Sequence, residues 1–170
     1  DTKAIIVVHL AGFPAEMDDI MRLARKHGIF VIEDCAQAHG ARYKGKPVGS
    51  IGHIGAWSFC QDKIMTTGGE GGMVTTNDKE LWRKMWSYKD HGKSWHSIYE
   101  KNHPPGFRWV HDSFGTNWRM IEMQAAIGRI QLKKMSEWTQ TRTKNAEAMR
   151  DICKDFDFIR VPKIPEHVVH

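Results

Sequence analysis

Apolar and polar positions in the first part of the chain follow two different periods. Residues 4–10 form a continuous apolar run rich in β-branched side chains, which predicts a strand covered on both faces of a parallel sheet. Residues 17–27 carry apolar side chains at helical spacing, with acidic residues early, basic residues late and Gly28 directly after them. A second apolar run at 29–32 leads to Asp34. Strand, helix and strand in this order predict a βαβ unit, and therefore a parallel sheet with a right-handed crossover.

The pattern continues with shorter elements. The elements expected next are a turn or short hairpin at 43–49, strands at 54–59 and 73–76, a helix at 78–88 and a long loop at 92–114. The loop is rich in histidine, proline, glycine and aromatic residues and has no period, and long loops of this kind are usually functional. Residues 119–156 have a helical pattern with a break near Ser136, and 158–162 begin another extended segment.

Composition places the chain among soluble globular proteins. Of its 170 residues, 41% are hydrophobic and 26% are charged, and the formal net charge is +5. Lysine and arginine are scattered between acidic and apolar residues, which favours a solvated surface over a nucleic-acid-binding patch. The mild excess of positive charge also suits a phosphorylated or nucleotide-linked substrate.

The cysteines, the histidines and the first residues exclude several classes of protein. Cys35, Cys60 and Cys153 have no CxxC spacing, and the ten histidines form no HExxH motif, so we expect neither a disulfide framework nor a metal site. No apolar run reaches the roughly 18 residues of a membrane helix, and no signal-peptide pattern precedes residue 4. These features predict a cytoplasmic protein without a membrane partner. Because the first strand begins without an initiator methionine, we expect an internal segment of a longer chain.

The position of Asp34 suggests a ligand-binding role. Ligands of open α/β sheets bind beyond the carboxyl ends of the strands, where Asp34 is expected. A carboxylate there can pair with a cationic heterocyclic nitrogen. A turn or helix-capping role is equally compatible with this position.

Four sequence blocks follow one another over most of the chain. They are Glu-Asp-Cys-Ala-Gln-Ala-His-Gly at 33–40, Ser-Phe-Cys-Gln-Asp-Lys at 58–63, Gly-Glu-Gly-Gly at 69–72, and Asn-Trp-Arg-Met with Gln-Ala-Ala at 117–126. Their order and composition resemble the DegT/StrS-type family of sugar aminotransferases, which are fold-type-I enzymes that use pyridoxal 5′-phosphate (PLP). The glycine block lacks the spacing of a nucleotide-binding loop, and the segment between Lys63 and this block contains one more glycine than the commonest spacing in the family.

The resemblance implies a fold and a domain organisation. We expect part of the three-layer α/β/α large domain of the fold-type-I PLP transferases, followed by the start of the small C-terminal domain. Residues 1–118 would belong to the PLP-binding large domain. Residues 119–156 would form a long helical segment that links the two domains, and 157–170 would begin the small one.

The resemblance also implies roles for individual residues. Lys63 would form the Schiff base with PLP and carry the proton during transamination. Asp34 would hold the protonated pyridine nitrogen, and Ala36 would pack against the ring. Gln37 would donate a hydrogen bond to the ring hydroxyl oxygen, and Ser58 would bind the phosphate. An exposed loop position is the ordinary alternative for Lys63.

Asn117 is expected to serve a neighbouring subunit. In the matching motif this residue reaches the cofactor phosphate of the other subunit, which implies a homodimer with shared active sites. Capping of a helix that begins near Arg119 is the local alternative.

Taken together, the resemblance predicts a PLP-dependent aminotransferase. The substrates would be a nucleotide-linked keto-sugar and an amino donor, with glutamate as the donor, in polysaccharide, lipopolysaccharide or other sugar biosynthesis. One alternative is a sugar dehydratase, but such relatives replace the Schiff-base lysine by histidine, and Lys63 argues against it. The other alternative is a non-catalytic PLP-fold protein with a regulatory or scaffold role. We also expect that the isolated segment could be inactive.

Overall fold

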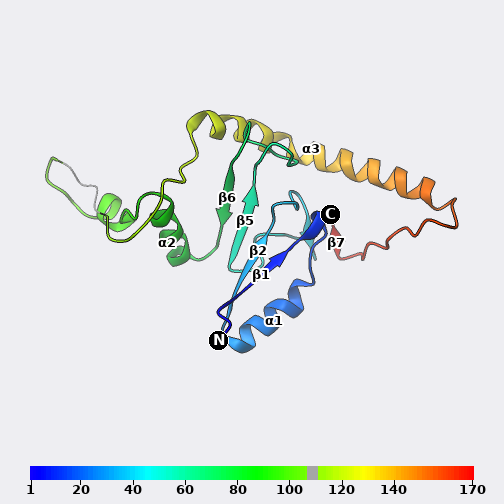
Figure 1. Cartoon of the computed structure of the whole chain (residues 1–170), viewed down its shortest axis with the longest axis horizontal. Coiled ribbons are helices and arrows are strands. Elements are labelled where there is room, and N and C mark those ends of the chain that lie inside the picture. The colour runs from blue at the N-terminus through cyan, green and yellow to red at the C-terminus, as the bar shows by residue number, and fades with distance from the viewer. Residues whose placement is uncertain (107–110) are drawn as a thin grey trace.

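The computed structural model describes residues 1–106 and 111–170 of the protein. A four-stranded sheet lies at its centre, with strand order β1-β2-β5-β6 (Figure 1). The strands are β1 (Ala4–Val8), β2 (Phe30–Asp34), β5 (Ile54–Ser58) and β6 (Gly72–Thr75). Part of the predicted loop at 92–114 falls on residues 107–110, which lie outside the described residues.

The first three elements confirm the predicted strand-helix-strand order. β1 pairs with β2 in parallel over the whole of both strands, and α1 (Met17–His27) connects them. The helix ends at Gly28, whose positive φ of 61° is the left-handed conformation that glycine adopts at low cost. β5 then pairs in parallel with β2, with Asp34 opposite Ala56. The carboxyl ends of all three strands therefore meet at one edge of the sheet.

The direction of β6 corrects the prediction of a wholly parallel sheet. β6 runs antiparallel to β5, with Gly72 opposite Ser58. The segment between them folds straight back along β5, because the Phe59 amide donates to the Gly71 carbonyl at 2.7 Å. Without a crossover to the opposite edge, the returning strand can only be antiparallel.

One face of the first two strands is packed and the other is exposed. Val7 and Val31 are buried against Met17 of α1, whereas Ile6 on the opposite face is 67% exposed. The expectation that residues 4–10 are covered on both faces is therefore not met by the described residues. α1 covers one face, and the strand alternation turns Ile6 to the other.

A second, small sheet confirms the predicted hairpin. β3 (Arg42–Tyr43) pairs antiparallel with β4 (Lys46–Pro47), and Lys44 and Gly45 between them have φ of 49° and 77°. Positive φ at both central residues is the conformation that suits a two-residue hairpin. β7 (Val168–Val169) adds to the free edge of β3 and brings the end of the chain back to the hairpin (Figure 1). The extended segment expected at 158–162 contains no strand.

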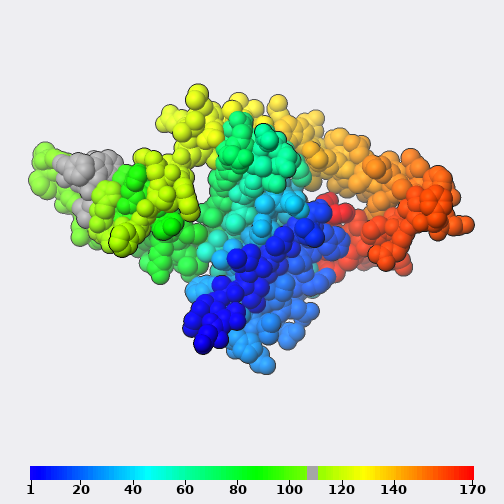
Figure 2. All heavy atoms as spheres, viewed as in Figure 1, coloured from blue at the N-terminus to red at the C-terminus, as the bar shows by residue number. Residues whose placement is uncertain are grey.

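The two later helices were predicted with mixed success. α2 (Lys79–Lys89) begins as expected, because Asp78 Oδ1 accepts hydrogen bonds from the amides of Glu80 and Leu81. α3 is a single helix (Glu122–Cys153), so the break predicted near Ser136 and the start near Arg119 are both wrong. Figure 2 shows this helix and the segment after it extending well beyond the sheet.

Two threonine hydroxyls bond to the backbone of α3 just after the predicted break. Thr139 Oγ1 donates to the Met135 carbonyl at 2.8 Å, and Thr143 Oγ1 donates to the Thr139 carbonyl at 3.0 Å. These side chains bond to the helix backbone instead of interrupting it. In the part of the chain that the structure describes, no helix has the length and hydrophobicity needed to cross a membrane.

The segment expected to be one long loop contains a helical turn. η2 (His96–Glu100) is a π-helical turn, and Trp95 before it packs edge-on against Trp82 and Trp86 of α2, with ring centroids 4.7 and 4.9 Å away. Aromatic contacts with α2, which no period in the sequence shows, order this part of the segment.

Candidate functional site

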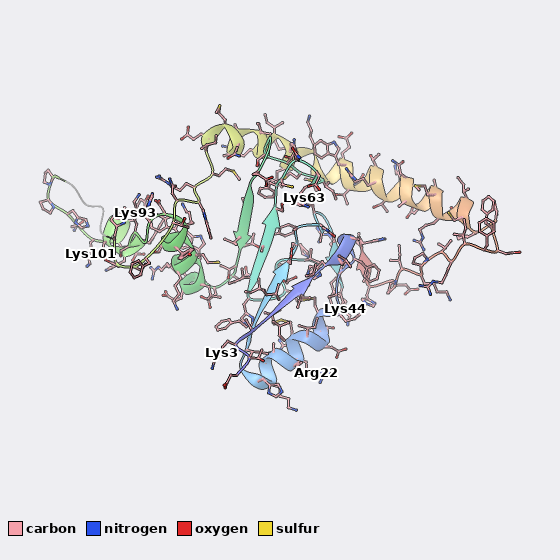
Figure 3. The ribbon with its side chains drawn as sticks, in the orientation of Figure 1. Lys3, Arg22, Lys44, Lys63, Lys93 and Lys101 are labelled. Carbon is pink, nitrogen blue, oxygen red and sulfur yellow. The ribbon has the colours of Figure 1, made fainter. Side chains whose placement is uncertain are left out.

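The carboxyl edge of the parallel strands brings three of the predicted site residues to one region. Asp34 ends β2 and Ser58 ends β5, and the pairing of Asp34 with Ala56 places Ser58 two residues further along the same edge. Lys63 lies in the loop that follows β5. Figure 3 shows it where this loop meets the first half of α3.

The turn after β2 is organised by side chains of the first sequence block. Asp34 Oδ1 accepts a hydrogen bond from the Ala36 amide at 3.0 Å, so the carboxylate does hold a turn. Gln37 Oε1 accepts from the Ala11 amide at 2.7 Å. Because an N–H donor faces the Gln37 oxygen, the amide nitrogen of that side chain is left as the donor end. The role of Gln37 toward the cofactor stays a prediction, and this orientation provides the donor that it requires.

Lys63 is shielded by its own loop. Its side chain is 19% exposed, and Nζ lies 3.4 Å from Asp62 Oδ1. The Cys60 thiol donates to the same carboxylate oxygen at 2.7 Å. This thiol and then the charge of Lys63 lower the pKa of Asp62. Ser58 Oγ accepts weakly from the Cys60 amide at 3.4 Å, which leaves its O–H available as a donor. The surroundings of Lys63 therefore differ from those of an exposed loop lysine.

His39 is a neighbour of this loop that the sequence reasoning did not select. Its ring is buried against Trp57 and Phe59, at centroid distances of 5.5 and 5.9 Å, and lines an apolar cavity of about 470 Å³. Neither ring nitrogen has a hydrogen-bond partner among the described residues. Burial lowers the pKa of His39 against an opposing effect of the Ser58 backbone, and the charge of Lys63 lowers it further. The position of His39 inside the sequence block at 33–40 could have marked it as a candidate site residue.

The glycine block is held against the start of α3. Gln124 Nε2 donates to the Glu70 carbonyl at 2.5 Å, and Gln131 Oε1 accepts from the Thr66 amide at 2.8 Å. A Cβ on Gly71 would lie 2.2 Å from Thr67 Oγ1, so no other residue fits there without movement. The segments 69–72 and 124–126 are therefore in direct contact, and this contact holds the loop that carries Lys63 in place.

Asn117 lies apart from these residues in the described structure. It forms an isolated antiparallel bridge with Asp90 at the end of α2, and its Oδ1 accepts from Arg119 Nε at 3.0 Å. The residue that precedes α3 is Ile121, so the helix-capping alternative for Asn117 is wrong. Asn117 is exposed and available to a second molecule.

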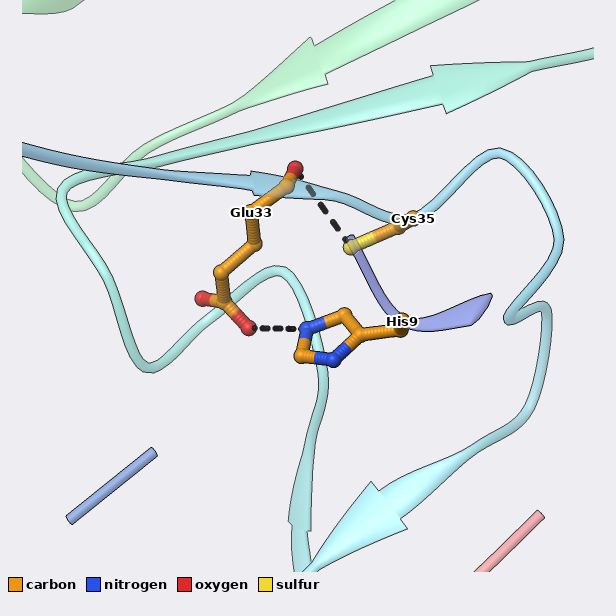
Figure 4. Close-up of side chains that lie close together, drawn as sticks. All are labelled: His9, Glu33 and Cys35. Carbon is orange, nitrogen blue, oxygen red and sulfur yellow. Dashed lines mark hydrogen bonds and ion pairs between the residues drawn. The ribbon is translucent and has the colours of Figure 1, made fainter. Parts of the chain in front are cut away.

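A buried polar network around Glu33 lies close to the carboxyl ends of β1 and β2 (Figure 4). Glu33 Oε2 accepts from His9 Nε2 at 3.0 Å and from the Gly49 amide at 2.7 Å, and Oε1 accepts from the amides of Ile51 and Gly52. Burial alone would raise the pKa of Glu33, but these hydrogen bonds outweigh it and lower the pKa. The carboxylate thus ties β1, β2 and the loop before β5 together.

His9, Glu33 and Cys35 also lie close enough to be examined as metal ligands. Both Glu33 oxygens and His9 Nε2 are occupied by the bonds just described, and His9 Nδ1 accepts from the Ala15 amide at 3.1 Å. Burial raises the pKa of Cys35 to about 12, so its sulfur stays a protonated thiol. The group acts as a structural network and not as a ligand set.

The arrangement of these blocks on one sheet edge agrees with a comparison to known proteins. Residues 1–170 match the model of the DegT/DnrJ/EryC1/StrS aminotransferase family. The chain belongs to this family. It is 42% identical over 172 residues to the UDP-N-acetyl-3-dehydro-alpha-D-glucosamine 3-aminotransferase of Acidithiobacillus ferrooxidans, covering 99% of this chain and 43% of that protein. It is 44% identical over 146 residues to the GDP-perosamine synthase of Escherichia coli O157:H7, covering 86% and 37%.

Solved structures agree with this assignment. The fold matches the aminotransferase of Psychrobacter cryohalolentis with a TM-score of 0.88 and 71% sequence identity, over 91% of this chain and 39% of that chain. The described part is therefore a portion of a fold-type-I PLP transferase domain. The chain spans about two fifths of the length of the curated relatives it matches.

The residues of the edge fit the cofactor of this family, which is PLP. They combine a carboxylate for a protonated ring nitrogen, an amide donor, a hydroxyl donor and a shielded lysine, supplied by Asp34, Gln37, Ser58 and Lys63. Each functional group has the chemical character that its part of the cofactor requires.

Proposed function

We propose that this chain forms the cofactor-binding part of a PLP-dependent aminotransferase that transfers an amino group from glutamate to a nucleotide-linked keto-sugar. The observation that carries the proposal is the gathering of Asp34, Ser58 and Lys63 at one edge of a parallel sheet. The hydrogen bonds of Gln124 to Glu70 and of Gln131 to Thr66 hold the Lys63 loop at that edge. The nucleotide-linked substrate is supported by the two curated relatives, whose names specify UDP- and GDP-linked sugars.

Asp34 and its neighbours would bind and orient the cofactor. The carboxylate of Asp34 keeps a proton on the ring nitrogen, because a nearby negative charge favours the cationic form. Ala36 offers a small side chain where the ring packs, and Gln37 donates its amide nitrogen to the ring hydroxyl oxygen. Ser58 donates its hydroxyl hydrogen to the phosphate.

Lys63 would hold the cofactor and move the proton. PLP supplies an electron sink that stabilises negative charge on the substrate carbon. When it is not bonded to the cofactor, the Lys63 Nζ would act as the acid–base group that takes up and releases the proton of the reaction. The hydrogen bonds that join Gln124 and Gln131 of α3 to the loop at 66–70 would limit the movement of Lys63.

A half-reaction tests the proposed activity. We expect the full-length protein, loaded with PLP and given glutamate without a sugar, to form up to one equivalent of 2-oxoglutarate per bound cofactor. Enzymatic assay of 2-oxoglutarate measures this yield, and free PLP with glutamate is the control. A PLP-binding regulatory protein without catalytic activity would form none. Formation of 2-oxoglutarate only at the rate of the control would contradict the proposal.

We further propose a homodimer in which Asn117 binds the cofactor phosphate of the partner subunit. Its exposed position, away from Asp34 and Lys63 of the same chain, supports a role across an interface. A neutral amide that donates to a charged phosphate contributes about 1.5–3 kcal/mol. We therefore expect Asn117→Ala to weaken PLP retention by about one to two powers of ten.

Mixed dimers separate the shared site from a role within one subunit. We expect full-length Lys63→Ala and Asn117→Ala subunits, each with little activity alone, to recover activity towards half of the native value when they form heterodimers. If Asn117 acts across the interface, one site carries both substitutions and the other carries none. Demonstrated heterodimers without recovery would show that Asn117 acts within its own subunit.

A further inference from the structure

A buried carboxylate lies at the end of α2, outside the edge that holds Asp34 and Lys63. Asp90 is 7% exposed and is surrounded by three cations. Its Oδ1 lies 3.0 Å from Lys93 Nζ and 3.6 Å from Arg119 Nε, and its Oδ2 lies 4.0 Å from Lys89 Nζ. Burial would raise the pKa of Asp90, but Lys93 and the other two cations lower it. Asp90 is therefore a charged group that orders the cations around it.

The backbone brings Asn117 to this carboxylate. Asp90 and Asn117 form an antiparallel bridge, the Thr116 amide donates to the Tyr88 carbonyl at 2.7 Å, and the Trp118 amide donates to the Lys89 carbonyl at 2.9 Å. The chain is thus fixed on both sides of Asn117. Its backbone position depends on these hydrogen bonds, which leaves the orientation of its side chain to other groups.

Arg119 links the two side chains. Its Nε lies 3.0 Å from Asn117 Oδ1 and 3.6 Å from Asp90 Oδ1. A guanidinium nitrogen can only donate, so the amide atom that faces it must be the oxygen of Asn117. The amide nitrogen, with its two N–H donors, is therefore turned away from Arg119. The orientation of the Asn117 amide follows from the chemistry of this pair, because only its oxygen can accept a hydrogen bond from Arg119.

We propose that Asp90 is a positioning residue for Asn117. Through Arg119, it holds the Asn117 amide with its nitrogen presented to an anionic acceptor. This rests on the proposed role of Asn117, for which the acceptor is the cofactor phosphate of the partner subunit. The cations around Asp90 outnumber it, so the surroundings of Asn117 are positive and favour an anion.

A double-mutant cycle on PLP affinity tests this positioning role. The full-length protein and its variants would be titrated with PLP, and Kd measured from absorbance. We expect Asp90→Asn to raise Kd by roughly fivefold, the size of one ordinary hydrogen bond. We expect the Asp90→Asn, Asn117→Ala double variant to bind PLP as weakly as Asn117→Ala alone. A residue that acts only on stability would instead give two effects that multiply.

Arg119→Lys provides a second variant, because Arg119 is half exposed and its replacement keeps the charge. Lysine cannot place a donor at the Nε position, so we expect a similar rise in Kd that also disappears in the Asn117→Ala background. Asp112→Asn is the matched control. It makes the same charge change at an exposed site in the segment whose backbone bonds to Gly92, and its Kd should stay within about twofold of the native value.

The possible outcomes separate this inference from the shared site itself. If Asn117→Ala weakens PLP binding while folded Asp90→Asn and Arg119→Lys proteins bind normally, only the positioning role is overturned. Multiplicative effects in the double variant overturn it as well. If Asn117→Ala leaves Kd unchanged, the shared-site proposal fails, and the positioning role fails with it.

Discussion

Replacement of Lys63 by alanine in the full-length protein should lower turnover by at least about 10²–10⁴-fold, the usual contribution of one positioned acid–base group. The reason is that Nζ would both hold the cofactor and move the proton, and Lys63 is the only lysine in the segments 35–41 and 59–71 that follow β2 and β5. Lys44→Ala is the matched control, because Lys44 sits in an exposed hairpin turn where it pairs with Asp18. Its turnover should remain close to native.

Covalent labelling locates the reacting lysine independently of turnover. Reduction of the PLP-loaded full-length protein with borohydride should fix the cofactor to one peptide, and mass spectrometry should place it on Lys63. The Lys63→Ala variant should lose this label, whereas Lys44→Ala should keep it. A label on Lys44, Lys46 or any other lysine would reject the assignment.

The second large effect is expected at Asp34. Asp34→Asn should remove roughly 3 kcal/mol of transition-state stabilisation, which is about a hundredfold in kcat/KM. The substitution removes the charge that keeps the ring nitrogen protonated. It preserves the fold, since an asparagine Oδ1 can still accept the hydrogen bond from the Ala36 amide.

Steady-state kinetics and thermal unfolding together test this expectation. The midpoint of unfolding of Asp34→Asn should stay near that of the native protein, while kcat/KM falls. Asp19→Asn, on the exposed face of α1, is the control for loss of one negative charge and should change neither quantity appreciably. Near-normal turnover of Asp34→Asn would leave Asp34 only its turn-forming role.

Local elements were predictable because their causes are local. The dipole-matched charges and the glycine after residue 27 specify α1 and its end, and Asp78 specifies the start of α2. Lys44 and Gly45 specify the hairpin turn. In each case the deciding interaction joins residues within one turn of each other, so the sequence pattern contains it.

Errors arose where distant residues decide the outcome. Ile6 belongs to an apolar run that predicts burial, but α1 covers only the opposite face of its strand. Trp95 orders part of a segment without period through contacts with α2. Pattern alone does not record which element packs against which face.

The candidate site also has features that the sequence predicted and features that only the tertiary structure showed. The rule that ligands bind at the carboxyl ends of parallel strands suggested Asp34, and the resemblance of the four blocks to a known family implied the roles of Asp34, Ser58 and Lys63. The sequence by itself thus determined the family, the cofactor chemistry and the candidate residues. These depend on which residue types occur in the four blocks and on their spacing.

Only the tertiary structure decided how those residues are supported. It joined Glu70 to Gln124 across the glycine block, buried His39 beside the Lys63 loop, and set Asp90 against Arg119 and Asn117. These contacts form between segments that are far apart in the sequence, and each depends on the paths of two elements at once. Local pattern carries no information about such paths, because packing in three dimensions selects them.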